Sequence, residues 1–437
     1  MLKKNPTGFY TFLLVFVLSI LAIGNWIDRT QSTPLILSFC TAFMAYVFVL
    51  QEKENPKILL GLGIILRIVL FFSMPSLSDD VYRFIWDGTL LKSGIHPFEQ
   101  LPTYYLNQNV QGINQALFDR LNSQPYFSIY PPLNQLIFWV SVSIGSENWL
   151  ISTIAIRVIL LLADVGSFFL LKKLLSRYGK SEHLAFWFLL NPLVILEFTG
   201  NLHFEGLVLL FLLAGIHFFE AGKKLWSGSS IGLAIGVKLL PLIYLPFLFL
   251  KGIKEKKWSI SILAGIVGLA TILPMLSQAF ISGMQTSLDL YFRSFEFNAS
   301  IYFIAREIGY WIYGYNNIAQ IGPLLSILSI VSILVISVIG TIKKWPIPKT
   351  FLFILTTYLT FTTTVHPWYI LPLVALGILS GYWYPIVWSF LIFFTYLGYT
   401  NTGFELPMIT VISEYVVVSL ILIFELKTKA KLLVHSK

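Results

Sequence analysis

Charged side chains are scarce in this sequence. Asp, Glu, Lys and Arg make up 12% of its 437 residues, whereas 56% of the residues are hydrophobic. A soluble domain of ordinary composition carries about 25% charged residues, which keep its surface in water. Apolar runs recur here from one end of the chain to the other, and each approaches or exceeds the length that crosses a hydrocarbon layer about 30 Å thick. The composition excludes a soluble globular protein and predicts an all-α, polytopic membrane protein.

Cysteine is almost absent, since the sequence contains one, Cys40, inside an apolar run. A single cysteine cannot form an intramolecular disulfide, and it excludes a metal site made of cysteines. A histidine metal motif such as HExxH is missing as well. No motif therefore supports a metal site, and a divalent cation, Mg²⁺ or Mn²⁺, stays open as a cofactor.

Acidic residues are fewer than basic ones, 21 against 30, which gives a formal net charge of +9 at pH 7. The basic residues form no single patch of the kind that binds nucleic acid. They lie in short clusters between apolar runs: Lys172-Lys173 with Arg177 and Lys180, Lys223-Lys224, Lys251 to Lys257, Lys343-Lys344 and Lys427 to Lys431. This positive-inside pattern predicts cytoplasmic loops beside an anionic leaflet, with both termini cytoplasmic, membrane lipids as partners and no nucleic acid.

The apolar runs predict about 12 to 14 transmembrane helices. We expect these spans near 8–26, 34–50, 57–74, 149–172, 183–199, 205–221, 226–239, 240–250, 258–276, 318–342, 350–364, 368–380, 383–399 and 406–426. The first run is also compatible with a cleavable signal peptide, but it is long and lacks a clear cleavage site, so we expect a retained helix.

The positive-inside rule decides how two ambiguous segments are interpreted. Segment 131–145 is too short to span and opens with two prolines, so we expect a helix in the outer interface. Lys238 and Pro241 divide 226–250 into two short spans, which returns the next basic cluster to the cytoplasm. The chain is then organised as three spans (1–74), an external loop with interfacial helices (75–148) and the remaining bundle (149–437), which contains a second external loop at about 277–317.

An acidic pair, Asp79-Asp80, directly follows the third span. The segment PSLSDDVYRFIWDGTLLKSGIHPFEQ (75–100) predicts a helix that Ser78 or Asp79 caps and Gly94 ends. Helical spacing puts its aromatic residues on one face and its charged residues on the neighbouring face, as in an interfacial amphipathic helix. Two adjacent carboxylates leave at least one available as a base. The plain alternative is a helix cap at the membrane boundary, without chemistry.

The other turns expected on the outer side are rich in polar and aromatic residues. They are PYFSIYPPLNQ (125–135), EFTGNLHFE (197–205), the hairpin tip at Lys238, YFRSFEFNASIYFIARE (291–307) and VHPWY (365–369). Ionisable groups at membrane depth are costly and are functional candidates, so we expect these turns to share a cavity. Structural alternatives exist for His203, as a turn pair with Glu205, and for His366, as a boundary residue.

Three further charged residues lie inside predicted spans. Arg157 and Asp164 are two turns apart on one predicted helix, and we expect a structural ion pair between them. Arg67 is expected to point inward or to extend toward the interface.

The motifs SDDVYRFIWDG and GIHPF resemble the first external loop of GT-C glycosyltransferases, especially the branch that depends on polyprenyl-phosphate-mannose. The resemblance continues through IYPPLNQ, NPLVILEF, HFEG, VKLLPLIYLP, FEFNASIY and HPWYILP, and it covers about residues 75–370. Apart from the first, each motif is weak alone, but their order and spacing are specific. The resemblance implies a GT-C-like bundle and a hexosyltransferase. Such enzymes move a sugar, here mannose, from a polyprenyl-phosphate donor to an acceptor hydroxyl at the outer membrane face, with inversion.

The resemblance also implies roles by position. Asp79 and Asp80 match the family's catalytic acidic residue, and we expect Asp79 to be the general base and Asp80 to aid positioning. The expected contacts to the donor phosphate or sugar are Lys238, Arg293, His203, His366, Tyr82 and Arg83. The residues expected to line the cavity or bind the acceptor are Trp86, Asp87, Tyr130, Glu205 and Asn298. The family also uses Asp-Glu and Asp-x-Asp patterns, so the Asp-Asp pattern leaves metal dependence open.

Two other functions are compatible with parts of the pattern. A transporter or flippase of a lipid-linked sugar predicts helix breaks near mid-membrane, such as those at Lys238–Pro241 and Asn191-Pro192. An O-antigen ligase or polymerase-like enzyme usually carries its large external loop late in the chain, whereas here the loop follows the third span. Abundant Lys, Ile and Phe with few Ala and Arg indicates an AT-rich bacterium. We therefore expect an inner (cell) membrane protein whose active side is periplasmic or extracellular, with a glycan, lipid or protein as acceptor.

Overall fold

The computed structural model describes residues 6–51 and 55–435, in which the regular elements are helices apart from one short hairpin. The first part contains α1 (Pro6–Asn25), α2 (Ser32–Gln51), α3 (Pro56–Ile68), α4 (Asp80–Lys92), α5 (Pro102–Tyr105), α6 (Gln115–Phe118), α7 (Pro132–Gly145) and α8 (Trp149–Arg177). The middle part contains η1 (Glu182–Ala185), α9 (Phe186–Leu189), α10 (Pro192–Val194), η2 (Ile195–Gly200), α11 (Glu205–Glu220), α12 (Lys224–Val237), η3 (Leu240–Tyr244), α13 (Leu245–Lys254), α14 (Ser259–Ile272) and η4 (Leu273–Met275).

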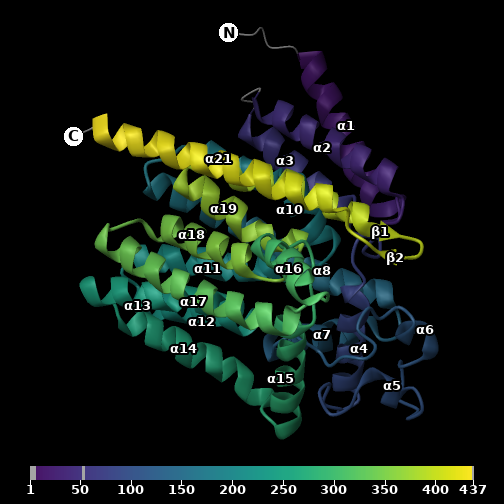
Figure 1. The fold of residues 1–437 in the computed structure, drawn as a ribbon. Coiled ribbons are helices and arrows are strands. Elements are labelled where there is room, and N and C mark those ends of the chain that lie inside the picture. Colours follow the sequence, from purple (N-terminus) through teal and green to yellow (C-terminus); the bar gives the residue numbers. More distant parts are fainter. Residues whose placement is uncertain (1–5, 52–54, 436–437) are drawn as a thin grey trace.

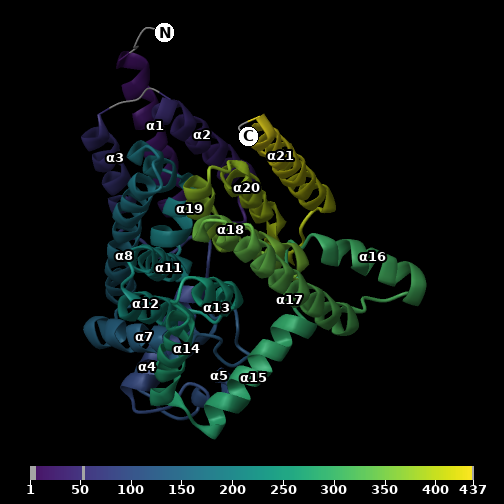
Figure 2. The same cartoon turned by 90° about the vertical axis from the view of Figure 1, so that its left-hand side faces the viewer.

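The last part begins with two helices that lie at the edge of the bundle, α15 (Gln278–Arg293) and α16 (Ile301–Tyr313); Figure 2 shows α16 extending away from the other helices. It continues with α17 (Ile318–Ile342), α18 (Ile347–Phe361), η5 (Pro367–Ile370), α19 (Leu371–Ser380), α20 (Tyr384–Leu391), η6 (Ile392–Gly398), β1 (Tyr399–Thr400), β2 (Gly403–Phe404) and α21 (Met408–His435). Strands β1 and β2 pair antiparallel. In Figure 1, α1–α3 and α21 lie along one edge of the bundle, and α13–α15 lie along the opposite edge.

The all-α polytopic membrane architecture is confirmed. Among the described residues, five helices are long and apolar enough to cross a membrane: α1, α2, α8, α17 and the first part of α21. The number rises to seven if two bent pairs, at 182–200 and 259–290, each count as one span, and three shorter apolar helices lie at 347–361, 367–380 and 384–398. The total of about 12 to 14 spans stays a prediction.

Large apolar side chains are exposed along these helices. On α17 they include Leu324, Ile327, Ile330, Val331 and Val335. A helix that is apolar on its outer side as well as its packed side is stable in hydrocarbon and not in water. The exposed apolar side chains agree with a lipid-facing perimeter.

The basic clusters lie where neighbouring helices end. Lys180 Nζ donates to the Leu379 carbonyl (2.7 Å), and Lys254 Nζ donates to the Thr341 carbonyl (3.1 Å). The last carbonyls of a helix have no partner within the helix and carry partial negative charge, so lysines stabilise them. Each of these two lysines therefore ties a segment predicted to face the cytoplasm to the end of a neighbouring helix.

Helix α4 begins directly at the acidic pair, as predicted. Asp79 occupies the N-cap position, but its side chain makes no cap hydrogen bond; Ser78 Oγ instead accepts from the Asp80 amide at 3.3 Å. Residues 81–90 are all buried, so the aromatic face of α4 packs against protein rather than lipid. A Cβ at Gly88 would lie 2.5 Å from the Phe138 carbonyl oxygen, so a glycine is needed where α4 crosses α7.

The buried charged residues pair differently from the prediction. Asp164 accepts from Arg67 Nε at 2.6 Å, and both side chains are inaccessible to solvent. Arg157 does not pair with Asp164; its guanidinium donates to the carbonyls of Phe71, Ser73, Thr199 and Gly200. Arg67 thus points inward, and the expected Arg157–Asp164 pair is wrong because each side chain reaches a neighbouring element instead of its own helix.

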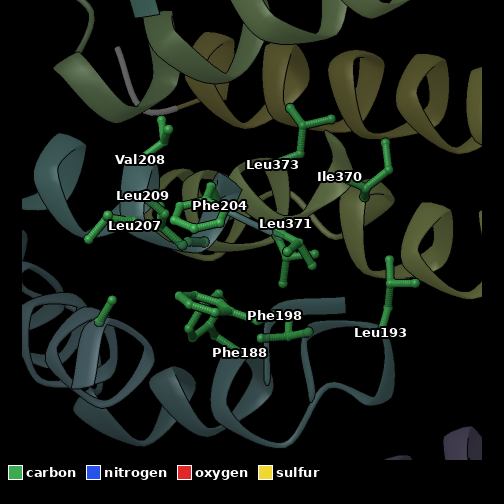
Figure 3. Packing of buried hydrophobic residues seen from close by; sticks show 14 of the residues in the cluster. Phe188, Leu193, Phe198, Phe204, Leu207, Val208, Leu209, Ile370, Leu371 and Leu373 are labelled. Atoms are coloured by element: carbon green, nitrogen blue, oxygen red, sulfur yellow. The ribbon is translucent and has the colours of Figure 1, made fainter. Parts of the chain in front are cut away.

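A sharp bend positions the polar turn that follows residue 200. The helical segments 182–189 and 192–200 meet at 55°. Asn191 Oδ1 accepts from the Leu193 amide, and Pro192 starts the next turn. Figure 3 shows the core beneath this bend, where Phe188, Leu193 and Phe198 lie near Phe204 and Leu371. The bend and its apolar core fix η2 and the residues after it.

Candidate active site

A cavity of about 380 Å³ lies among the connections at one end of the bundle, between residues of α1–α2, α3–α4 and α18–α19. Every connection that the sequence assigned to the outer side contributes to its wall. The contributions include Arg29, Asp79 and Asp80, Tyr130, His203 and Glu205, Lys238, Glu296, His366 and Trp368, and Tyr399 with Phe404. Because these residues are far apart in the sequence, the cavity is a product of the whole bundle rather than of one loop.

The two carboxylates of the acidic pair face this cavity in different surroundings. Arg29 donates to Asp79 Oδ2, and the Asp79 side chain is 33% exposed. Asp80 accepts from Tyr130 Oη at 3.0 Å and from Asn122 Nδ2 at 2.8 Å, and its side chain is 19% exposed. Asp79 therefore has a charged partner, whereas Asp80 has two neutral donors.

His203 lies behind Asp80 in the cavity wall. Its Nδ1 is 3.9 Å from Asp80 Oδ2, and its Nε2 is 3.3 Å from Glu197 Oε2. Its ring stacks on Trp368, with centroids 3.6 Å apart and 17° between the planes. The turn pair expected between His203 and Glu205 is not formed, because Glu205 faces Lys238 across the cavity mouth.

Lys238 is the residue that ends α12. Its ammonium donates to Glu205 Oε1 and lies 5.1 Å from the centre of the Tyr369 ring. Its side chain is 22% exposed, so the charge is accessible from the cavity. The other carboxylate oxygen of Glu205 is buried and accepts no hydrogen bond from the described residues.

His366 closes the cavity from the α18–α19 connection. Burial, together with the positive charge of Lys238, lowers the pKa of His366 well below its usual value. The imidazole is therefore neutral at physiological pH, and its Nδ1 is buried without a hydrogen-bond partner in the described part of the chain. Phe297 packs on it at 4.4 Å between ring centroids and is held by a backbone bridge to Thr364.

Arg83 and Asp87, two of the expected site residues, form a buried network next to the cavity wall. Arg83 reaches the cavity, but its guanidinium is occupied by Asp87 (2.8 Å) and the Tyr126 carbonyl (2.9 Å). Asp87 also accepts from Ser128 and Gln135 and lies outside the cavity. This buried network anchors the 123–130 segment, which carries Tyr130, to α4.

The structure places four other expected residues away from the cavity. Arg293 is exposed and pairs with Asp289 one turn earlier. Asn298 is buried and donates to Glu414 on α21. Tyr82 and Trp86 pack within the protein, on the buried helix α4. The cavity thus brings together Asp79, Asp80, Lys238, His203, His366, Arg83, Tyr130 and Glu205, and it does not include Arg293, Tyr82, Trp86, Asp87 or Asn298.

Sequence reasoning missed Arg29, Trp368 and Tyr399 as site residues. Arg29 could have been found from the sequence, because it is one of the few basic residues on the side predicted to be external. The pKa of Tyr399 is raised to about 12 by burial, so its hydroxyl stays protonated. Trp368 and Tyr399 resemble ordinary interfacial aromatic residues, and only the tertiary structure shows that they face the acidic pair.

The donors in this cavity suit polar organic ligands. Within the described ranges, no group of three or more His, Cys, Asp and Glu side chains is placed to hold a metal ion. The buried atoms without partners, Glu205 Oε2 and His366 Nδ1, can accept hydrogen bonds from hydroxyl groups. With the carboxylates and the ammonium of Lys238, the arrangement can bind a polyol and an anion and can accept a proton.

Comparison with known protein families identifies a family that matches this chain. A family model described as "Alpha-(1->6)-mannopyranosyltransferase, N-terminal domain" matches residues 22–253, which is more than half of the chain. The matched range includes the acidic pair, the polar turn at 197–205 and Lys238.

Individual relatives bear the same name. The chain is 29% identical over 197 residues to alpha-(1->6)-mannopyranosyltransferase A of Mycobacterium tuberculosis strain H37Rv, an alignment that covers 43% of this chain and 36% of the relative. It is 22% identical over 182 residues to alpha-(1->6)-mannopyranosyltransferase A of Corynebacterium glutamicum, covering 41% and 36%. Each alignment thus spans about a third of the relative's own length. No solved structure matches the chain.

Proposed function

The chain belongs to the alpha-(1->6)-mannopyranosyltransferase family, and from this premise we propose that it is an integral-membrane mannosyltransferase. The enzyme would move mannose from a polyprenyl-phosphate-linked donor to the hydroxyl of a glycan, lipid or protein acceptor, with inversion. The observation that carries the proposal is that the acidic pair and Lys238, about 160 positions apart in the chain, line one cavity. The names of the relatives and the GT-C-like motifs support the sugar and the donor class.

We infer that Asp80 is the general base. Inverting transfer needs one carboxylate that takes the proton of the acceptor hydroxyl while the phosphate departs on the opposite side. Asp79 would have to displace Arg29 before that oxygen met a substrate, whereas the donors on Asp80 orient its carboxylate without neutralising it. This assignment reverses the preference for Asp79 that position alone suggested, and Asp79 instead holds Arg29 at the cavity.

Two cations are available for the phosphate. Lys238 and Arg29 are each paired with one carboxylate and are each partly exposed to the cavity. A phosphate can exchange with the carboxylate partner and take over the charge-assisted hydrogen bonds. Lys238 lies beside the first turn of α11, whose amide dipoles add positive potential. These groups would stabilise the charge on the leaving phosphate.

The sugar would lie against the aromatic wall. Trp368 and Tyr369 present rings to the cavity, and Glu205 Oε2 and His366 Nδ1 are acceptors without partners in the described structure. A hexose offers hydroxyl donors to such acceptors and apolar C–H faces to such rings. The neutral state of His366 fits this role better than a contact to phosphate.

The proposed setting is a bacterial inner (cell) membrane with the cavity on the periplasmic or extracellular side and both termini in the cytoplasm. The distribution of basic residues supports this orientation, because Lys180, Lys254 and Lys257, in segments predicted to be cytoplasmic, lie against the ends of neighbouring helices. The lining of the cavity comes from the predicted outer connections, which favours an enzyme site over a two-sided transport pathway.

The proposal is tested by transfer assays on membranes that contain the protein. With radiolabelled polyprenyl-phosphate-mannose and an endogenous acceptor, we expect mannosyl transfer that the Asp80→Asn variant lowers by about 10²- to 10⁴-fold, the range that general-base catalysis contributes. Asp79→Asn should lose less, because it removes a partner of Arg29. Asp119→Asn, an exposed carboxylate of the same loop, is the matched control.

Full transfer by both the single and the double variant of the acidic pair would overturn the assignment. Transfer from other polyprenyl-phosphate sugars but not from mannose would overturn the sugar.

A further inference from the structure

We propose that His203, held by the buried Glu197, receives the proton that Asp80 takes from the acceptor, so that Asp80, His203 and Glu197 form a proton relay. The inference rests on the proposed function, because it needs Asp80 as the base. It gives His203 a role other than binding the donor, and it gives a role to Glu197, which lies outside the cavity lining.

Glu197 is buried and is held in place by two hydrogen-bond donors. Its side chain is inaccessible to solvent. Oε1 accepts from Tyr396 Oη at 2.7 Å, and Oε2 accepts from Asn201 Nδ2 at 3.1 Å. Asn201 in turn accepts from the Leu77 amide, which ties Glu197 to the segment that leads into the acidic pair. A carboxylate with two such donors stays in one position while its neighbours exchange protons.

The backbone around Glu197 is irregular. Glu197 lies on η2, a π-helical turn, and such turns are rare and frequent at functional sites. Leu202, immediately before His203, has a φ of +64°, which an L residue with a branched side chain adopts only when the surrounding structure enforces it. Together these two irregularities present Glu197 and His203 to each other.

The ring of His203 is held with one nitrogen toward each carboxylate. Stacking on Trp368 fixes its plane, and the two nitrogens lie 3.3 Å from Glu197 and 3.9 Å from Asp80. A core histidine with a structural role would have both nitrogens hydrogen-bonded. Here Nε2 lacks hydrogen-bond geometry within the described structure, and Nδ1 is 3.9 Å from Asp80 Oδ2, longer than a hydrogen bond, as catalytic contacts often are without substrate.

In the proposed reaction, the proton of the acceptor hydroxyl passes first to Asp80 and then to His203. The acceptor oxygen forms a bond to the anomeric carbon as its proton passes to the Asp80 carboxylate. The bond from that carbon to the phosphate oxygen breaks, and its electron pair leaves with the polyprenyl phosphate. Asp80 then gives the proton to Nδ1 of neutral His203, which restores the carboxylate, and the imidazolium releases the proton to water through the cavity. Glu197 stabilises the imidazolium while it exists.

Other charged groups around His203 set the balance of this relay. Glu197 from η2 and Asp80 from α4 place carboxylates beside the ring, and Lys238 from the end of α12 places an ammonium in the same cavity. His366 stacks on the same indole at 4.4 Å and is neutral, so it adds no charge at physiological pH. Glu205 and Lys238 neutralise each other in their ion pair. The Glu197 carboxylate, 3.3 Å from Nε2, therefore lies closer to the ring than the Asp80 carboxylate does.

The test uses the full-length protein in membranes or detergent, with polyprenyl-phosphate-mannose as the donor. We expect Glu197→Gln and His203→Asn to lower kcat by about 10- to 100-fold with little change in the KM for the donor. The acid limb of the kcat–pH profile should move to lower pH in Glu197→Gln, because the imidazolium has lost its carboxylate. Added imidazole should restore part of the kcat of His203→Ala. The matched control is His217→Ala, a histidine outside the cavity.

The outcomes separate the relay from the proposed function. If the wild-type protein transfers sugar and Asp80→Asn does not, but Glu197→Gln keeps the wild-type kcat and pH profile, the relay is overturned and the proposed function stands. A rise in donor KM at constant kcat in His203→Asn would also overturn the relay, since it would mark a binding contact. If the wild-type protein transfers no sugar, the proposed function itself fails. Tyr396→Phe removes one donor to Glu197 and leaves the core intact, so a smaller loss of kcat there supports the relay if Glu197→Gln does not fold.

Discussion

Two groups of charged residues lie within this apolar protein, and they are built differently. The first, Arg67, Asp164 and Arg157, is sealed inside the bundle, with every side chain inaccessible to solvent. The second, the acidic pair with Arg29 and Lys238, lines the cavity, and its side chains are 19% to 33% exposed. Charge at membrane depth is costly in both places.

The partners of the two groups explain the difference. Arg157 has four backbone carbonyls as partners, which no substrate can replace. Arg29 and Lys238 each have one side-chain carboxylate as the main partner. Atoms without partners occur in both groups, since Arg67 Nη2 and Asp164 Oδ1 have none in the described structure. A buried polar atom without a hydrogen-bond partner therefore does not by itself indicate a functional site. A better indication is a charged group beside a cavity whose carboxylate partner a substrate can replace.

The largest expected effect comes from the sealed group. Asp164→Ala leaves the Arg67 guanidinium buried without its carboxylate, which should destabilise the protein by about 3–5 kcal/mol. We expect a strongly lowered thermal midpoint in detergent and poor yield. Asp289→Ala breaks an exposed pair of the same type and should change stability by less than about 0.5 kcal/mol. Equal midpoints for the two variants would remove the distinction between the groups. The double replacement of Arg67 and Asp164 by leucine should recover part of the loss, because it leaves no unpaired charge.

The second effect concerns the cavity group and should appear in catalysis rather than in folding. Lys238→Ala should lower kcat/KM for the donor by about 10²-fold, or about 2.7 kcal/mol, because it removes a cation from the departing phosphate. Lys238→Arg should retain much of the activity. Arg293→Ala, which removes an exposed cation outside the cavity, should leave kcat/KM unchanged. A large loss of thermal stability in Lys238→Ala with normal turnover would place Lys238 in the structural group instead.

The sequence predicts the elements well and their pairings poorly. Apolar runs and their breaks depend on neighbouring residues, so the ends of α8, α11 and α17 lie within a few residues of the expected limits. The position of the acidic pair at the start of a helix follows from the same local pattern. The distribution of basic residues between the apolar runs also indicated which connections lie on the same side of the membrane. Those connections form the cavity.

Pairing depends on contacts between distant elements, which periodicity does not encode. Asp164 is seven residues from Arg157 but pairs with Arg67, 97 positions away. His203 is two residues from Glu205 but faces Glu197, because the π-helical turn and the left-handed Leu202 change its direction. The resemblance implied that Asp87 lines the cavity, but the packing of α7 against α4 buries it.

A third prediction tests how strongly the neutral donors orient Asp80. Tyr130→Phe removes one hydrogen bond to the carboxylate and keeps the ring, so kcat should fall about fivefold, the equivalent of about 1 kcal/mol. Stability should change little, in contrast to the sealed group. Tyr104→Phe, an exposed tyrosine of the same loop, is the control. Wild-type kcat in Tyr130→Phe would show that Asp80 is oriented by other groups.

The smallest expected effect is a pH dependence of stability at His366. Burial and the positive charge of Lys238 lower the pKa of His366 in the folded protein below the value of about 6.5 that it has when unfolded. The unfolded chain then binds more protons below pH 6.5, so the stability contributed by neutral His366 is present above that pH and is lost as the pH falls. His366→Gln cannot be protonated, so the difference in thermal midpoint between the wild-type protein and this variant should shrink from pH 8 to pH 5. A constant difference over that range would mean that His366 is already accessible to protons in the folded state. Its environment would then resemble that of the exposed, exchangeable charges of the cavity rather than the sealed group.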